Sequence, residues 1–230
     1  MPEAMVEPLT ETRLHQGLAW LAARDPHLAA LVQRLGPPPR WAREPGFGAL
    51  ILIILEQQVS LASARATFDR LLALVSPLTP AGLLQLDDAA LRAIGFSRQK
   101  TAYSRQLALD TLDGKLDLAG LATLPDDLAR AVLVARKGIG PWTADIYLLM
   151  CLQRPDVWPV GDLALQVAMQ EIKGLERRPT GVEMEAIAEP WRPWRAVAAR
   201  LLWHYYLSGR SPQQRMAVPT ALLSGETAEG

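Results

Sequence analysis

Proline and glycine divide this chain into segments of helical length, and this division limits the fold more than any other feature of the sequence. The segments between the breaks are rich in Leu, Ala, Arg and Gln. Alternating runs of Val, Ile and Thr, which indicate strands, are nearly absent. The pattern therefore predicts an all-α fold of roughly eight to ten helices. The breaks fall at residues 36–39, 45–46, 77–80, 95, 114, 125, 138–141, 155–159, 174–181 and 190–193.

The two ends of the chain differ from the rest. Residues 1–44 are interpreted as an N-terminal helix, Arg13 to Leu35, with a Pro-rich connector, and we expect both to pack on the core. Residues 45–210 form the main helical domain. Residues 211–230 are polar and rich in small residues, which predicts a loosely ordered tail. A chain of 230 residues that is 50% hydrophobic can form one well-buried core or two small lobes that share a cleft.

Charge and cysteine content limit the classes of function. The formal net charge is zero, which counts against a protein whose DNA affinity comes from neutralising many phosphates, although one local positive face would suffice for a compact enzyme. Cys151 is the only cysteine and lies in an apolar stretch. One cysteine is too few for a disulfide framework, a thiolate zinc site or a four-cysteine iron–sulfur cluster. A single buried thiol is typical of the reducing cytoplasm.

Neither a membrane span nor a signal peptide is expected. The longest apolar run, residues 49–55, is far shorter than the roughly 20 residues that cross a bilayer. Glu3 and Glu7 stand where a signal peptide would carry basic and apolar residues. We therefore expect a soluble monomer in the cytoplasm, associated with the nucleoid if the source is bacterial.

The most informative stretch runs from Leu133 to Asp145. Gly138 and Gly140 enclose one apolar residue and permit backbone angles forbidden to other residues, while Pro141 suits the first position of a new helix. A helix-hairpin-helix unit that begins near residue 126 is therefore predicted. Amide N–H groups at such a turn have no acceptor within the helix and suit a backbone phosphate. A lone Gly-x-Gly usually does no more than join two helices, so the context decides.

That context resembles a known family. Trp142 follows the turn directly, and Asp162 lies twenty residues further on. The chain here resembles the helix-hairpin-helix DNA glycosylases, and most of all the 3-methyladenine DNA glycosylase II branch. The resemblance covers roughly residues 45–210 in the family's order. The matching stretches are residues 56–60, 95–102, 138–144, 159–162 and 192–205.

Two departures from the family pattern are visible. Arg136 and Lys137 replace the leucine-proline pair that usually precedes the hairpin glycines, which predicts either an added phosphate contact or a looser turn. The β-rich N-terminal domain of longer members is not encoded in residues 1–44. The resemblance is therefore to a short form of the family.

The resemblance implies a two-lobed helical bundle with its active-site cleft between the lobes. It implies an enzyme that flips alkylated purines out of double-stranded DNA and hydrolyses their N-glycosidic bond, which initiates base excision repair. Asp162 would stabilise the oxocarbenium-like sugar and orient or deprotonate the attacking water. The alternative role of Asp162 is a helix N-cap, and both roles can hold together. No second acid is evident, which fits cationic bases that leave easily.

The base pocket is expected to contain aromatic residues. Trp142 stands where related lyases carry a Schiff-base lysine, so a monofunctional enzyme is implied, with Trp142 stacking on the base. Trp203 is the second candidate, followed by Tyr147 and Phe47. For each of these aromatics, ordinary core packing is the alternative.

Two segments are candidates for contacts with DNA. The Glu56-Gln57-Gln58 stretch interrupts an apolar helix, and its polar side chains are expected to be exposed or at a cleft. By resemblance Gln58 fills the gap left by the flipped base, with Gln57 beside it; a solvated helix junction is the alternative. Ser60 begins the next helix. The hairpin supplies the remaining candidates, Lys137, Gly138, Ile139, Gly140 and Thr143.

No cofactor and no catalytic metal are expected. His15, His27 and His204 show no metal-ligand spacing. By resemblance, main-chain carbonyls of Val134, Arg136 and Ile139 would bind a structural Na⁺ or K⁺. Three other functions stay open: a glycosylase of deaminated or oxidised bases, a non-catalytic helix-hairpin-helix DNA-binding protein, and a helical interaction protein.

Overall fold

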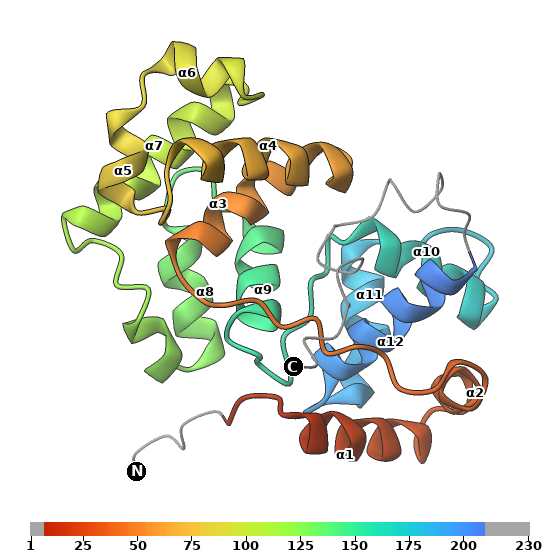
Figure 1. Ribbon diagram of the computed structural model, residues 1–230. Coiled ribbons are helices and arrows are strands. Elements are labelled where there is room, and N and C mark those ends of the chain that lie inside the picture. The colour runs from red at the N-terminus through yellow and green to blue at the C-terminus, as the bar shows by residue number, and fades with distance from the viewer. Residues whose placement is uncertain (1–6, 210–230) are drawn as a thin grey trace, which may run out of the picture. The chain divides into compact units, whose positions relative to one another are not determined.

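The computed structural model describes residues 7–209, and within this range the chain forms two compact units (Figure 1). One unit comprises residues 43–152, and the other comprises residues 7–42 together with residues 153–209. The described residues form twelve α-helices, two short 3₁₀-helices and no strand. The all-α prediction is confirmed, although the number of helices exceeds the prediction because short breaks divide several segments.

The unit of residues 43–152 is built around α3. Its apolar residues are buried at 0–7% exposure almost throughout the helix, from Phe47 to Leu55, so it packs on several sides at once. It contacts α4, α7 and α9, and α8 packs on α9 (Figure 1). The helices of this unit are α3 (Phe47–Glu56), α4 (Leu61–Leu74), α5 (Pro80–Gln85), α6 (Asp88–Ala93), α7 (Arg98–Leu112), η1 (Gly120–Thr123), α8 (Asp126–Val134) and α9 (Pro141–Met150).

The other unit is built around α12. This helix contacts α1, α2, α10 and η2, and buries residues on every side. Arg200 is fully buried in it, and burial lowers its pKa to about 9; its guanidinium donates to the carbonyls of Arg40 and Ala196. The helices of this unit are α1 (Glu11–Ala22), α2 (Pro26–Leu35), α10 (Leu163–Lys173), α11 (Gly181–Ala188), η2 (Glu189–Trp191) and α12 (Arg195–Ser208).

The N-terminal segment forms two helices, so the expected single helix from Arg13 to Leu35 is wrong. The first of them ends at Ala22. Asp25 caps the second by accepting from the amides of His27 and Leu28, and Pro26 occupies the first position of α2. The other oxygen of Asp25 accepts from Lys173 Nζ at 2.7 Å and Trp191 Nε1 at 2.9 Å. These contacts hold the start of α2 against α10 and η2.

The expected domain limits can be compared with this division. The chain passes from one unit to the other at residue 43, next to the predicted limit at residue 44. The predicted tail, residues 211–230, lies outside the described residues. Between residues 7 and 209 no helix has the length and apolar character needed to cross a bilayer.

Candidate functional site

The predicted helix-hairpin-helix is present, with α8 ending at Val134 and α9 beginning at Pro141. Gly138 has φ +91°, and a Cβ added there would lie 2.6 Å from Cδ2 of Tyr103 on α7. The turn therefore requires glycine at this position for both backbone and steric reasons. Gly140 has φ −87°, and a Cβ there would meet no protein atom within 4 Å. The expectation that both glycines supply forbidden angles is wrong for Gly140, whose open surroundings leave room for a ligand.

The residues around these glycines divide into buried and exposed ones. Ile139 is 4% exposed and anchors the turn, and its amide donates to the carbonyl of Arg136. Arg136 lies toward α7, with its guanidinium 3.8 Å from the carboxylate of Asp110. Lys137 is exposed. Of the two residues that replace the family's leucine-proline pair, Lys137 is thus the more exposed.

The turn between α3 and α4 presents Gln58. Helix α3 ends at Glu56, and Gln58 is exposed with φ +56°, a left-handed conformation that turns the chain sharply. Ser60 caps α4, as predicted, by accepting from the amide of Ser63 at 3.3 Å. Gln58 thus occupies the tip of a tight turn between two helices.

Gln57 does not point away with its neighbour. Its side-chain Nε2 donates to the carbonyl of Gly138 and to Oγ1 of Thr143, each at 2.9 Å. Thr143 is 2% exposed. The structure therefore brings the predicted turn residue Gln57 together with the predicted hairpin residues Gly138 and Thr143.

Glu56 is buried, and the expectation that its side chain is exposed or at a cleft is wrong. The residue is 4% exposed, and its carboxylate pairs with both Nη atoms of Arg43, at 2.7 and 3.2 Å. Burial raises the pKa of Glu56, and the nearby charge of Arg43 opposes that rise. Lys100 on α7 donates to the carbonyl of Leu55 at 2.6 Å, and burial lowers its pKa. These groups support the last turn of α3 directly before Gln58.

Asp162 caps α10 and is buried, at 2% exposure. Its Oδ1 accepts from the amide of Leu165 at 3.0 Å and from Nε1 of Trp203 at 3.1 Å. Trp203, on α12, is fully buried. Two N–H donors and a helix N-terminus thus face one carboxylate oxygen, an arrangement that stabilises the anion and fixes its orientation.

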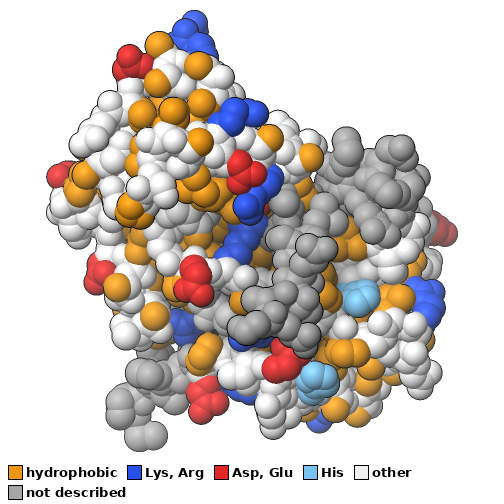
Figure 2. Space-filling model, viewed as in Figure 1, with side chains coloured by type: hydrophobic (Ala, Val, Ile, Leu, Met, Phe, Trp, Pro, Cys, Tyr) orange, Lys and Arg blue, Asp and Glu red, His pale blue; other side chains and the backbone are white. Residues whose placement is uncertain are grey.

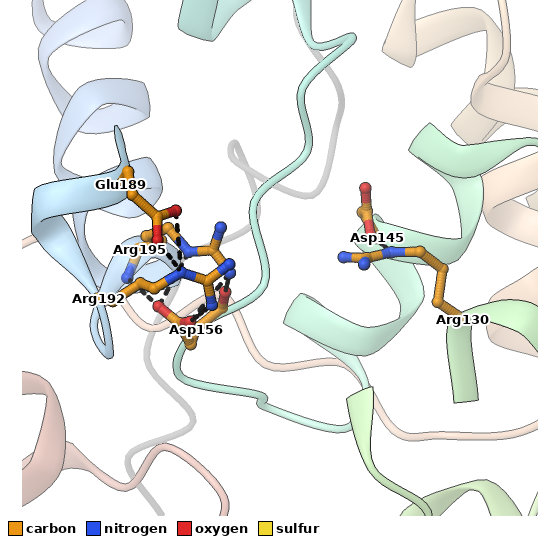
Figure 3. A network of polar contacts seen from close by, with 6 residues as sticks. All are labelled: Arg130, Asp145, Asp156, Glu189, Arg192 and Arg195. Atoms are coloured by element: carbon orange, nitrogen blue, oxygen red, sulfur yellow. Dashed lines mark hydrogen bonds and ion pairs between the residues drawn. The ribbon is translucent and has the colours of Figure 1, made fainter. Parts of the chain in front are cut away.

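Asp156 holds the start of α12 (Figure 3). Its Oδ1 accepts from the amide and Nε of Arg195, and its Oδ2 accepts from Arg195 Nη2 and Arg192 Nη1. No local spacing in the sequence predicts this contact, because Arg192 and Arg195 lie 36 and 39 residues from Asp156. The contact fixes the helix that carries Trp203, and so supports Asp162 indirectly.

The remaining aromatic candidates lie in the unit of residues 43–152. Trp142 is half-buried at the second position of α9. Tyr147 is fully buried; its hydroxyl accepts from the amide of Gly46 at 3.0 Å, and burial raises its pKa. Phe47 is 7% exposed. These contacts favour the packing alternative for Tyr147 and Phe47, whose pocket role stays a prediction.

A salt bridge joins the two helices of the motif. Arg130 of α8 donates from Nε to Oδ1 of Asp145 on α9 at 2.6 Å (Figure 3). Asp145 is 4% exposed. The pair adds to the contact between α8 and α9. The hairpin is therefore held by polar contacts as well as by Ile139.

Comparisons with known proteins agree with these features. The family described as HhH-GPD superfamily base excision DNA repair protein matches residues 51–193. DNA-3-methyladenine glycosylase 1 of Schizosaccharomyces pombe is 28% identical over 208 residues, which cover 87% of this chain and 89% of that protein. DNA-3-methyladenine glycosylase of Bacillus subtilis is 30% identical over 121 residues, 53% of this chain and 40% of that protein.

A solved structure is similar as well. The Schizosaccharomyces pombe 3-methyladenine DNA glycosylase Mag1, in complex with abasic DNA, matches with a TM-score of 0.76 and 28% identity over 82% of this chain and 95% of that one. The chain thus spans most of the yeast relative but only two fifths of the bacterial one. Because the family match covers more than half of the sequence and includes the hairpin and Asp162, this protein belongs to the HhH-GPD superfamily of base excision DNA repair proteins.

Proposed function

We propose that this protein is a monofunctional DNA glycosylase of the 3-methyladenine DNA glycosylase II type, which removes alkylated purines from double-stranded DNA. The environment of Asp162 carries the proposal. A carboxylate that accepts from Leu165 and Trp203 is fixed as an anion in a nearly dry setting. Such an anion stabilises the positive charge that develops on the sugar when the base departs. The similarity to relatives named as 3-methyladenine glycosylases supports the substrate class.

The absence of lyase chemistry is proposed from Trp142. An indole cannot form the imine through which lyases cleave the backbone, so the product would be an intact strand with an abasic site. Half-buried Trp142 would instead stack on the electron-poor alkylated base. A cationic base needs little help from a general acid, which fits a mechanism carried by one carboxylate.

DNA binding is proposed to depend on local contacts at the hairpin. On the face drawn in Figure 2, Lys and Arg side chains are interspersed with acidic and apolar ones. Exposed Lys137 and the amides at Gly138 and Gly140 would receive one phosphate. Val134 is the last residue of α8, where main-chain carbonyls have no acceptor role within the helix. Its carbonyl, together with those of Arg136 and Ile139, would bind a monovalent cation. We further propose that the protein acts as a monomer in the cytoplasm, associated with the nucleoid if the source is bacterial.

Incubation of the protein with alkylated duplex DNA is expected to release N3-methyladenine and N7-methylguanine and to leave an unbroken strand with abasic sites. Chromatography of the released bases and a denaturing gel before and after alkali treatment measure both results. Borohydride present during turnover is expected to trap no covalent adduct. A trapped adduct would refute the monofunctional mechanism. In a parallel incubation with duplex DNA that contains hypoxanthine, release of hypoxanthine without release of alkylated bases would favour a glycosylase of deaminated bases. Tight DNA binding without release of any base would favour a DNA-binding module.

Replacing Gln58 by alanine is expected to slow excision from duplex DNA by roughly tenfold and to affect single-stranded DNA little. Gln58 stands exposed at the tip of its turn, where it can fill the gap left by the flipped base. Such a plug offsets part of the few kcal/mol that unstacking costs, and a single strand has no stack to hold open. Single-turnover rates on both substrates provide the measurement. Equal losses on the two substrates would return Gln58 to a solvated helix junction.

A further inference from the structure

The turn that presents Gln58 and the hairpin that is proposed to bind a phosphate are connected through one side chain. Gln57 Nε2 donates at 2.9 Å both to the carbonyl of Gly138 in the hairpin and to Thr143 Oγ1 in the first turn of α9. These partners lie 81 and 86 residues away in sequence. The side chain of Gln57 therefore bonds to other residues of the protein, although the sequence predicts it as a DNA contact.

The two connected segments also share a support. Lys100 of α7 donates to the carbonyl of Leu55, which fixes the last turn of α3 just before Gln57. One turn further along α7, the ring of Tyr103 lies against the backbone of Gly138. Helix α7 therefore contacts both segments, and Gln57 links them to each other. The position of Gln58 is thereby defined relative to the glycines of the hairpin.

We propose that Gln57 is a positioning residue that couples phosphate binding at the hairpin to insertion of Gln58 into the duplex. This inference rests on the proposed function. A phosphate held at Gly138 and Gly140 fixes the DNA backbone, and a residue that enters the stack must then meet one base step. Misplacement by about 1 Å can cost a large factor in rate even when each element is intact. The two hydrogen bonds of Gln57 provide the rigid connection that this registration requires.

Three substitutions test the coupling. Gln57→Met keeps the length of the side chain and removes the donor, and Thr143→Val keeps the shape of its partner and removes one acceptor. Gln85→Met makes the same exchange at an exposed position at the end of α5 and serves as the matched control. Gln57→Met is expected to slow excision from duplex DNA roughly tenfold, with a smaller loss for Thr143→Val, which keeps the bond to Gly138. Excision from a single strand and affinity for undamaged duplex should match those of Gln85→Met.

A second readout does not depend on base release. Duplex DNA that contains an abasic analogue beside 2-aminopurine becomes fluorescent when the protein unstacks the reporter. Wild type and Gln85→Met are expected to raise the fluorescence, and Gln57→Met is expected to raise it less. Adding Gln58→Ala to Gln57→Met should cause little further loss, because a misplaced plug is already ineffective.

The outcomes separate this inference from the proposed function. If wild type unstacks the reporter but releases no base, the proposed function is wrong and the reporter still tests the coupling. The coupling is overturned if Gln57→Met behaves like Gln85→Met in both assays, or if its effects and those of Gln58→Ala are additive. Equal losses on duplex and single strand, together with a fall in Tm, would assign Gln57 a purely structural role and would also overturn it.

Discussion

Asp162→Asn is expected to lower the rate of base excision by about 10²–10³, with little change in stability or DNA affinity. Oδ1 of Asp162 accepts from the amide of Leu165 and from Nε1 of Trp203. An asparagine carbonyl can accept the same two bonds and is an equally good N-cap, so the free energy of unfolding should fall by no more than about 1 kcal/mol. The negative charge that stabilises the sugar cation is lost. The most labile cationic bases should show the smallest loss, because they depart with less help.

The measurement is single-turnover release of N7-methylguanine and hypoxanthine by wild type and variant, together with Tm and affinity for abasic DNA. Asp87→Asn is the matched control, since Asp87 is an exposed N-cap of α6 whose Oδ1 accepts from Ala90 at 2.7 Å. It makes the same chemical change at the start of a helix in the unit of residues 43–152, whereas Asp162 belongs to the other unit. If Asp162→Asn excises both bases at the wild-type rate, Asp162 is a helix cap only and the proposed mechanism is wrong.

The second large effect is expected at the hairpin, where two glycines two residues apart should respond in different ways. Gly138→Ala places a methyl group against the ring of Tyr103 at a backbone angle of +91°. Overpacking and backbone strain together should lower the free energy of unfolding by about 2–6 kcal/mol. Gly140→Ala meets no protein atom and has an ordinary φ, so it should cost at most about 1 kcal/mol, the difference between glycine and alanine at an N-cap.

Gly140→Ala is expected to weaken DNA binding although it leaves the fold intact. The methyl group of Gly140→Ala projects into the space where a phosphate would approach the amides of α9, so it should weaken binding to all DNA sequences alike. Chemical denaturation and binding titrations at fixed salt measure the two effects. Full stability together with unchanged affinity in Gly140→Ala would remove this side of the hairpin from the DNA interface.

Local chemistry made the hairpin and the helix starts predictable. Pro141 after Gly-Ile-Gly begins α9, and Ser60 and Asp162 cap their helices because a side-chain oxygen near free amides is a contact within three residues. The expected single N-terminal helix is wrong for the same reason, because Asp25 before Pro26 is a local signal for a helix start inside that segment.

Contacts between distant residues could not be predicted in this way. Burial of Glu56 depends on Arg43, which lies thirteen residues earlier, and the clamp on α12 depends on Asp156 and Arg195, thirty-nine residues apart. A charged residue in sequence looks solvated until the tertiary fold supplies its partner. The same holds for Trp203, a base-pocket candidate by resemblance, whose full burial and bond to Asp162 no local pattern could predict and whose pocket role stays a prediction.

The division of the chain has a consequence for its synthesis. Residues 43–152 form a unit with an uninterrupted sequence, whereas the other unit is assembled from residues 7–42 and 153–209. As the polypeptide leaves the ribosome, the first unit can fold as soon as its own residues have emerged. Helices α1 and α2 emerge earlier, yet both contact α12, which follows residues 43–152 in the chain. Helices α1 and α2 can therefore complete their packing only after α12 has emerged, and until then their buried leucines, such as Leu14 and Leu28, are a target for chaperones or for aggregation.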